Sequence, residues 1–143
     1  MVLNTTYHNK EQLLLIDDLI GKQFSFFEKL RKGGIGSKRL MIKEVKLGST
    51  YKQTTTQDLK YASIELRPSG IVVHVKQAHD SYAWAIPYYK LVIYKTSGLS
   101  IHADGKFIQF RNNKLLKENR KFFNTLLDEK VKFDAHFFNP SMP

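Results

Sequence analysis

The apolar positions near the start of the chain recur at the spacing of an amphipathic helix. Their intervals are three and four residues through Leu13, Ile16, Ile20, Phe24, Phe27 and Leu30. Because an α-helix completes a turn in about 3.6 residues, this spacing places them on one face. Asn9 and Gln12 suit the beginning of such a helix, and Gly33 can end it. The pattern predicts one helix over residues 10–32, with an earlier end at Gly21 as the alternative.

From residue 37 the period of the pattern falls to two, which is typical of strands with one buried face. The alternating segments are "KRLMIKEVKLG", "YASIEL", "IVVHV", "YAWAI", "YYKLVIYK", "LSIHA" and "KFIQF". Residues 49–58 are polar and rich in threonine, which favours a long loop over an exposed hairpin arm. Seven strands separated by short turns over residues 37–111 predict an antiparallel barrel or sandwich.

A helical period returns after Asn112, a plausible N-cap residue. The apolar stripe consists of Leu115, Leu116, Phe122, Phe123, Leu126 and Leu127. Basic residues occupy the rest of the surface, so an amphipathic helix is expected over residues 112–129, where it closes the barrel. The tail, residues 130–143, contains three Phe and either docks on the body or contacts a partner. The whole chain, residues 1–143, is predicted to be one α+β domain.

One long segment resembles a known family. The stretch "WAIPYYKLVIYKTSGLSIHADGKFIQFRNNKLLKENRKFFNTL" is similar to the second half of bacterial PH-like (pleckstrin-homology-like) domains, and the overall resemblance covers residues 37–129. It implies a seven-stranded barrel with a closing C-terminal helix. The N-terminal helix and the long segment at residues 49–58 are departures from that pattern.

The aromatic cluster in "SYAWAIPYYKLVIYK" has two interpretations. In a barrel, Trp84 is expected to fill the core, with its indole N–H bonded near the barrel end. Tyr82, Tyr88 and Tyr94 are each either core residues or part of an outer face. Exposed tyrosines beside lysines would form a small contact surface, so Tyr88 and Lys90 are candidate partner-binding residues.

Composition narrows the class of protein. The 143 residues are 42% hydrophobic, which suits a folded domain with its own core. No cysteine is present, which excludes disulfides, thiolate metal sites and a cysteine nucleophile. The N-terminal sequence has no basic region before its apolar run, and no segment has about 18 consecutive apolar residues. A cytoplasmic protein is therefore expected.

The net charge of +10 is concentrated in two segments. Eight basic residues lie between Lys29 and Lys52, and six lie between Lys106 and Lys121. Such an excess attracts anionic partners, although it can also serve only solubility. The stripe of the closing helix faces the core, so its basic residues must face solvent; the candidate partner-binding residues there are Arg111, Lys114, Lys117 and Lys121.

No pattern of catalytic residues emerges. The five histidines lack the spacing of metal ligands on one helix, although strand pairing could bring His74 and His102 together. The segment "GGIGSKR" follows a helix rather than a strand, so it favours a helix end over a phosphate loop. We expect a non-catalytic interaction domain, without cofactor or metal, that binds a protein or anionic partner. A nucleic-acid-binding protein that uses Lys, Arg and exposed Tyr is the alternative.

Overall fold

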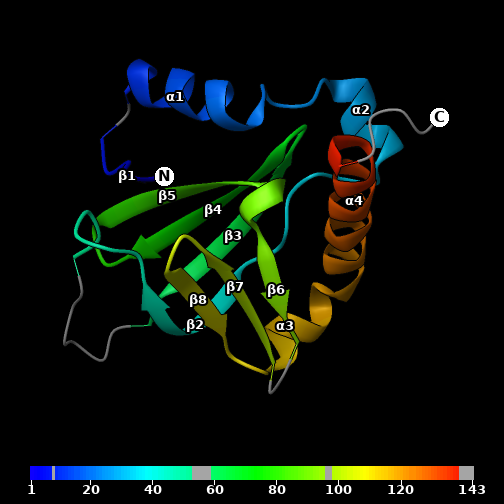
Figure 1. The fold of residues 1–143 in the computed structure, drawn as a ribbon. Helices are drawn as coiled ribbons and strands as arrows, with labels where there is room; N and C mark the ends of the chain where they lie inside the picture. The colour runs from blue at the N-terminus through cyan, green and yellow to red at the C-terminus, as the bar shows by residue number, and fades with distance from the viewer. Residues whose placement is uncertain (8, 53–58, 96–97, 139–143) are drawn as a thin grey trace.

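An antiparallel sheet forms the framework of the molecule. The computed structural model describes residues 1–7, 9–52, 59–95 and 98–138. Over these residues it contains one sheet of eight strands in the order β1-β5-β4-β3-β2-β8-β7-β6 (Figure 1). The strands are β1 (Val2–Asn4), β2 (Leu40–Lys46), β3 (Tyr61–Arg67), β4 (Gly70–Gln77), β5 (Asp80–Pro87), β6 (Val92–Tyr94), β7 (Leu99–Ala103) and β8 (Lys106–Phe110). The predicted α+β class is confirmed.

The prediction of a closed seven-stranded barrel is corrected in two respects. An eighth strand, β1, pairs with β5 through Val2 and Trp84. The sheet is open, with β1 and β6 at its two edges. Strand β1 has only three residues, so its sequence is too short to show a period of two.

Helices lie on one face and along one side of this sheet. They are α1 (Lys10–Ile20), α2 (Phe26–Arg31), α3 (Lys114–Glu118) and α4 (Arg120–Phe138), with one 3₁₀ helix, η1 (Tyr88–Lys90). Figure 1 shows α1 across the top of the sheet and α4 down one side of the body. Among the described residues, no helix is long and apolar enough to cross a membrane.

The prediction of a single helix over residues 10–32 is wrong, because helix α1 ends at Ile20. Gly21 follows α1 with a φ of 87°, a conformation that favours glycine, and its N–H donates to the carbonyl of Asp17. A second start lies at Ser25, which forms a capping box with Glu28. The alternative end at Gly21 is thus the correct one.

Helix α1 packs on the outer face of the sheet, which we define as the face that carries Val72, Ala83 and Ala85. Ile16 and Ile20 form a small apolar cluster with these three residues. Helix α2, in contrast, buries none of its residues, and Phe26 and Phe27 are largely exposed. Of the predicted stripe beyond Gly21, Phe24 packs partly buried against the main core, whereas Phe27 and Leu30 are exposed.

The main core lies on the opposite, inner face. The hairpin of β3 and β4, predicted from their alternation, pairs Ile64 with Val73 and places both in this core. Trp84 is 1% exposed, in agreement with its predicted core position. From the C-terminal helix, Phe123 and Leu126 are buried in the core, whereas Phe122 is only partly buried.

The C-terminal helical region differs from the predicted helix over residues 112–129. Its N-cap is Asn113 rather than Asn112, and the helix is divided at Asn119 into α3 and α4. Helix α4 continues to Phe138, so the prediction of a tail beginning at residue 130 is wrong; residues 139–143 of that tail lie outside the described residues. Lys130 fastens this extension, since its Nζ donates to the carbonyl of Tyr88 (3.1 Å) and to Asp134 (2.7 Å).

Two further predictions, a strand at residues 88–95 and a loop at residues 49–58, can be compared with the structure. The strand expected at residues 88–95 is mostly replaced by η1, after which β6 contains only Val92–Tyr94. Of the loop predicted at residues 49–58, residues 53–58 lie outside the described residues, while residues 49–52 form no helix or strand. Tyr51 from this loop is buried and donates to Gln77; burial, with a smaller contribution from Tyr82, raises the pKa of Tyr51 to about 12.

Candidate functional site

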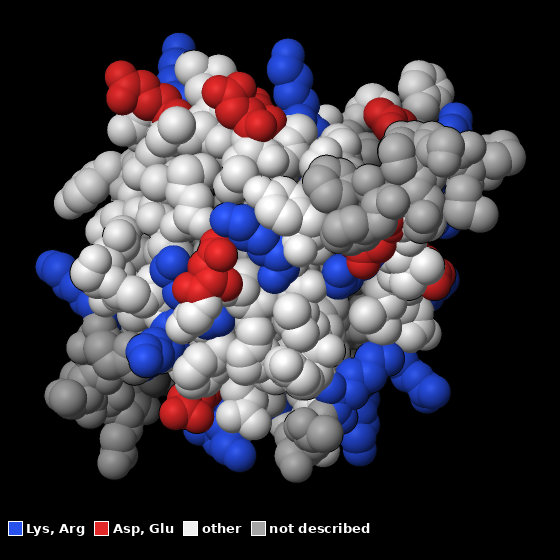
Figure 2. All heavy atoms as spheres, viewed as in Figure 1, with Lys and Arg blue, Asp and Glu red and all other residues white. Residues whose placement is uncertain are grey.

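Four of the predicted site residues form an exposed basic group around α3. Arg111, Lys114, Lys117 and Lys121 are all exposed, and in the described part of the chain none of them forms an ion pair. Asn113 caps α3 by accepting from the N–H of Leu116. Lys and Arg side chains gather over α3, at the lower right of Figure 2. The predicted solvent-facing orientation of these four residues is confirmed.

The second basic segment of the sequence joins this group through strand pairing. The N–H of Arg111 donates to the carbonyl of Met41 (2.9 Å), next to the pairing of Ile42 with Phe110. Farther along, the N–H of Lys38 donates to Oδ1 of Asn119 (2.8 Å), between α3 and α4. Lys38 is exposed. The basic surface, as we define it, contains Lys38, Arg111, Lys114, Lys117 and Lys121.

The sequence could not show that these two segments meet. About seventy residues separate Met41 from Arg111, and their contact depends on the pairing of β2 with β8. The signal available in the sequence was the charge excess in each segment. The fold converts the two segments into one surface.

The other two predicted site residues do not belong to it. Tyr88 is 1% exposed and its ring lies 5.5 Å from that of Phe133, so the prediction of an exposed contact residue is wrong. Burial and the negative charge of Glu129 raise the pKa of Tyr88. Tyr88 is turned inward because η1, not a strand, follows Pro87.

Lys90 is exposed, as predicted, but lies apart from the basic surface. Its Nζ is 3.3 Å from a carboxylate oxygen of Asp104. The η1 turn that carries it contacts α4 at Lys130, roughly 14 Å along the helix from Lys121 at 1.5 Å per residue. Tyr88 and Lys90 therefore do not form the contact surface expected from the aromatic cluster.

A groove on the outer face of β3–β5 is a second feature that the sequence did not indicate. It has a volume of about 660 Å³, and its polar lining residues include Arg39, Tyr61, Ser63, His74, Lys76 and Ser81. Strand pairing fixes their relative positions, since Tyr61 lies opposite Lys76, which in turn lies opposite Ser81. The residues that line the groove include no Asp or Glu. The groove is therefore suited to an anionic or hydrogen-bonding ligand rather than to a cation.

The groove meets the basic surface at Met41. Tyr61, at the edge of the groove, pairs with Met41, and the neighbour of Met41 on the other side is Arg111. The guanidinium carbon of Arg39 lies 4.2 Å from the centre of the Tyr61 ring, which is a cation–π contact. The groove and the basic surface are thus adjacent parts of one side of the molecule.

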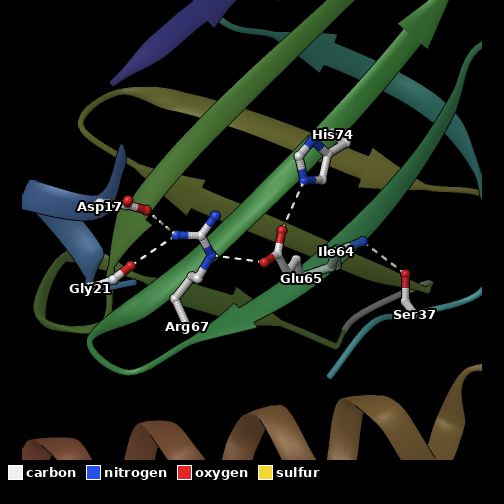
Figure 3. Close-up of polar contacts among 7 residues, drawn as sticks. All are labelled: Asp17, Gly21, Ser37, Ile64, Glu65, Arg67 and His74. Carbon is white, nitrogen blue, oxygen red and sulfur yellow. Dashed lines mark hydrogen bonds and ion pairs between the residues drawn. The ribbon is translucent and has the colours of Figure 1, made fainter. Parts of the chain in front are cut away.

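Between the groove and α1 lies a network of charged side chains (Figure 3). Arg67 is 3% exposed; it donates to Asp17 (2.9 Å), to Glu65 (2.8 Å) and to the carbonyl of Gly21 (2.9 Å). His74, which also lines the groove, lies 3.3 Å from the other oxygen of Glu65. The network connects the end of α1 to the sheet, so its first role is structural.

The protonation of Glu65 follows from this network. Burial alone would raise the pKa of its carboxyl group, but the hydrogen bonds from His74 and Arg67 and the charge of Arg67 outweigh burial and lower it. Glu65 is therefore ionised at neutral pH and holds both partners in place. Tyr61, Ser63, Glu65 and Arg67 alternate along β3 in the sequence, a polar pattern that could have indicated this face; their partner on α1 could not have been identified.

The other residues considered for metal or phosphate binding do not come together in a site within the described part of the chain. Among the described residues, no group of three or more His, Asp or Glu is placed to hold a metal ion; His8 lies outside them. His74 and His102 lie on β4 and β7, which are not neighbours in the sheet, so the suggested pairing of the two is wrong. At "GGIGSKR", the N–H of Gly34 donates to the carbonyl of Lys29, which ends α2 as predicted.

The basic surface and the groove are the features from which a function can be argued. No family model, no curated protein and no solved structure matches the chain.

Proposed function

We propose that this protein is a non-catalytic binding module whose basic surface binds an anionic partner. One observation carries the proposal: two basic segments far apart in the sequence converge on a single exposed surface. Such an arrangement produces a positive potential that attracts anions and increases their rate of association.

The charges of this surface are not needed to hold the fold together. Its five cationic residues are exposed and, over the described residues, form no ion pair, and exposed pairs contribute at most about 1 kcal/mol. Ion pairs that do fasten elements occur elsewhere, at Arg67 with Asp17 and at Lys32 with Glu129. The basic side chains therefore remain available to a partner.

The arrangement of elements also supports a PH-like fold as part of the proposal. Strands β2 to β5 and strands β6 to β8 form two meanders that are joined by the pairing of β2 with β8, and a helix follows. That helix contributes Phe123 and Leu126 to the same core as the strands. Seven strands followed by a closing helix is the order implied by the resemblance to bacterial PH-like domains. Strand β1 and helices α1 and α2 are additions to it.

Reversing the charge of Lys114, Lys117 and Lys121 to Glu tests the proposal. The variant is expected to lose retention on heparin at about 200 mM salt, because the dense part of the basic surface becomes acidic. Its thermal midpoint is expected to stay close to that of the wild type, since these side chains are exposed. Salt elution from a heparin column and thermal unfolding are the two measurements.

A charge-matched control separates the surface from the net charge. Lys10, Lys22 and Lys132 are also exposed and lie outside the basic surface. Reversing these three to Glu gives the same net charge of +4 as the test variant, since three reversals each remove two charges from +10. The control should stay on heparin to a clearly higher salt concentration than the test variant. Equal elution of the two variants would overturn the proposal.

A further inference from the structure

We propose that the anionic partner is a single-stranded nucleic acid, with its phosphates on the basic surface and one unpaired base stacked in the groove. This inference rests on the proposed function and adds the class of partner. The observation behind it is that the groove contains a cation–π pair, Arg39 and Tyr61, directly beside the basic surface.

The two parts form a continuous track across the outer face. Ser81, Lys76, Tyr61 and Met41 are successive partners across four strands, and Arg111 follows Met41. Neighbouring strands are about 4.8 Å apart, so these four steps cover about 19 Å. That length spans several nucleotides of an extended strand, whose phosphates repeat every 6–7 Å or so, roughly twice the 3.4 Å rise of a stacked duplex.

The groove offers what an unpaired base requires. The guanidinium carbon of Arg39 lies 4.2 Å from the centre of the Tyr61 ring, and the Arg39 side chain is exposed, so its planar group is accessible to a base. Ser63 and Ser81 supply hydroxyl groups in the groove, and His74 supplies a ring nitrogen. The volume of about 660 Å³ lies within the range of small-molecule sites, roughly 300 to 1,000 Å³.

The same features favour a single strand over other anions. A duplex offers its phosphates but keeps its bases paired, so it cannot place a base on Arg39. An acidic peptide would neutralise the lysines but would leave the cation–π pair unused. Only a flexible strand supplies regularly spaced charges together with free aromatic faces.

The test compares two oligomers of equal charge, a twelve-nucleotide oligothymidylate and an abasic oligomer of the same length. In fluorescence anisotropy at a fixed low salt concentration, the wild-type protein should bind oligothymidylate about 5-fold or more tightly than the abasic oligomer, as expected for one stacked base. Arg39→Lys keeps the charge but removes the planar group, so it should abolish this preference.

Two further variants separate stacking from loss of structure. Tyr61→Phe keeps the ring and should preserve the preference, whereas Tyr61→Ala should abolish it. Tyr94→Ala, an exposed tyrosine on the edge strand β6, should have no effect. If Tyr61→Ala does not fold, the loss of the preference in Arg39→Lys and its retention in Tyr61→Phe still test the inference.

Several outcomes would overturn the inference while leaving the proposed function intact. These are equal wild-type affinity for the two oligomers, an unchanged preference in Arg39→Lys, equal or tighter binding of a duplex, and binding of heparin or polyglutamate without binding of oligothymidylate. Failure of the wild-type protein to bind heparin as well as both oligomers would instead overturn the proposed function.

Discussion

Replacing Arg67 with methionine is expected to lower the free energy of unfolding by about 3 kcal/mol or more. The guanidinium is almost fully buried and pairs with Asp17 and Glu65, and it also donates to the carbonyl of Gly21. Methionine fills much of the space but leaves two carboxylates and a carbonyl without their donor. Because Asp17 and Gly21 belong to the end of α1, the loss should loosen that helix from the sheet.

Urea unfolding followed by circular dichroism measures this effect. The matched control is Lys90→Met, which removes an exposed cation from its pair with Asp104 and should change stability by less than about 1 kcal/mol. Arg67→Lys keeps the charge without the forked donor geometry and should fall between the two. A change below about 1 kcal/mol in Arg67→Met would show that the network does not fasten α1.

Replacing Phe123 with alanine is expected to cost about 3 to 5 kcal/mol, the range for a buried phenylalanine. Its side chain is 4% exposed and lies 6.3 Å from the ring of Phe110 on β8, so the substitution opens a cavity between helix and sheet. The neighbouring Phe122 is only partly buried, and its replacement by alanine should cost clearly less.

This pair of variants corrects an expectation drawn from the helical stripe. In the sequence, Phe122 and Phe123 are equally good candidates for the core, because both fall within the apolar stripe. The position of α4 on the sheet makes Phe123 the inner residue. Equal losses of stability in the two variants, measured by urea unfolding, would contradict that placement.

The strands were the part of the fold most open to prediction from the sequence. Alternation identifies β3 and β4 because their inner residues, such as Ile64 and Val73, meet the core while every second residue meets the outer face. Strand β1 was missed because its formation depends on pairing with β5 rather than on a pattern of its own. Whether the sheet closes into a barrel or stays open likewise depends on three-dimensional geometry that no local pattern encodes.

The helix ends were harder to predict for a physical reason. Phe24, Phe27 and Leu30 continue the spacing of α1, yet the conformation of Gly21 breaks the helix and leaves α2 without a buried side. At the other end of the chain, α4 passes residue 129 because Lys130 and Phe133 find partners on η1. Tertiary contacts of this kind override the local signal.

The candidate site was predictable only in part. The exposed positions of Lys114, Lys117 and Lys121 followed from the apolar stripe of the predicted closing helix, although they belong to α3 and α4 and Arg111 lies just before α3. The inward position of Tyr88 depends on η1, and the contribution of Lys38 depends on a bond to Asn119. The groove needs three strands in register before it exists at all. The basic residues could therefore be identified from the sequence, but the surface that they form together could not.

Mapping the binding face directly is the decisive measurement for the central claim, that the basic surface binds an anionic partner. A short heparin oligosaccharide can be titrated into ¹⁵N-labelled protein while the amide chemical shifts are followed by NMR. The account predicts that the largest shifts fall on residues 38–43 and 111–121, which pairing of β2 with β8 brings together. Largest shifts at α1, or around Lys90 and Asp104, with residues 111–121 unmoved, would contradict it.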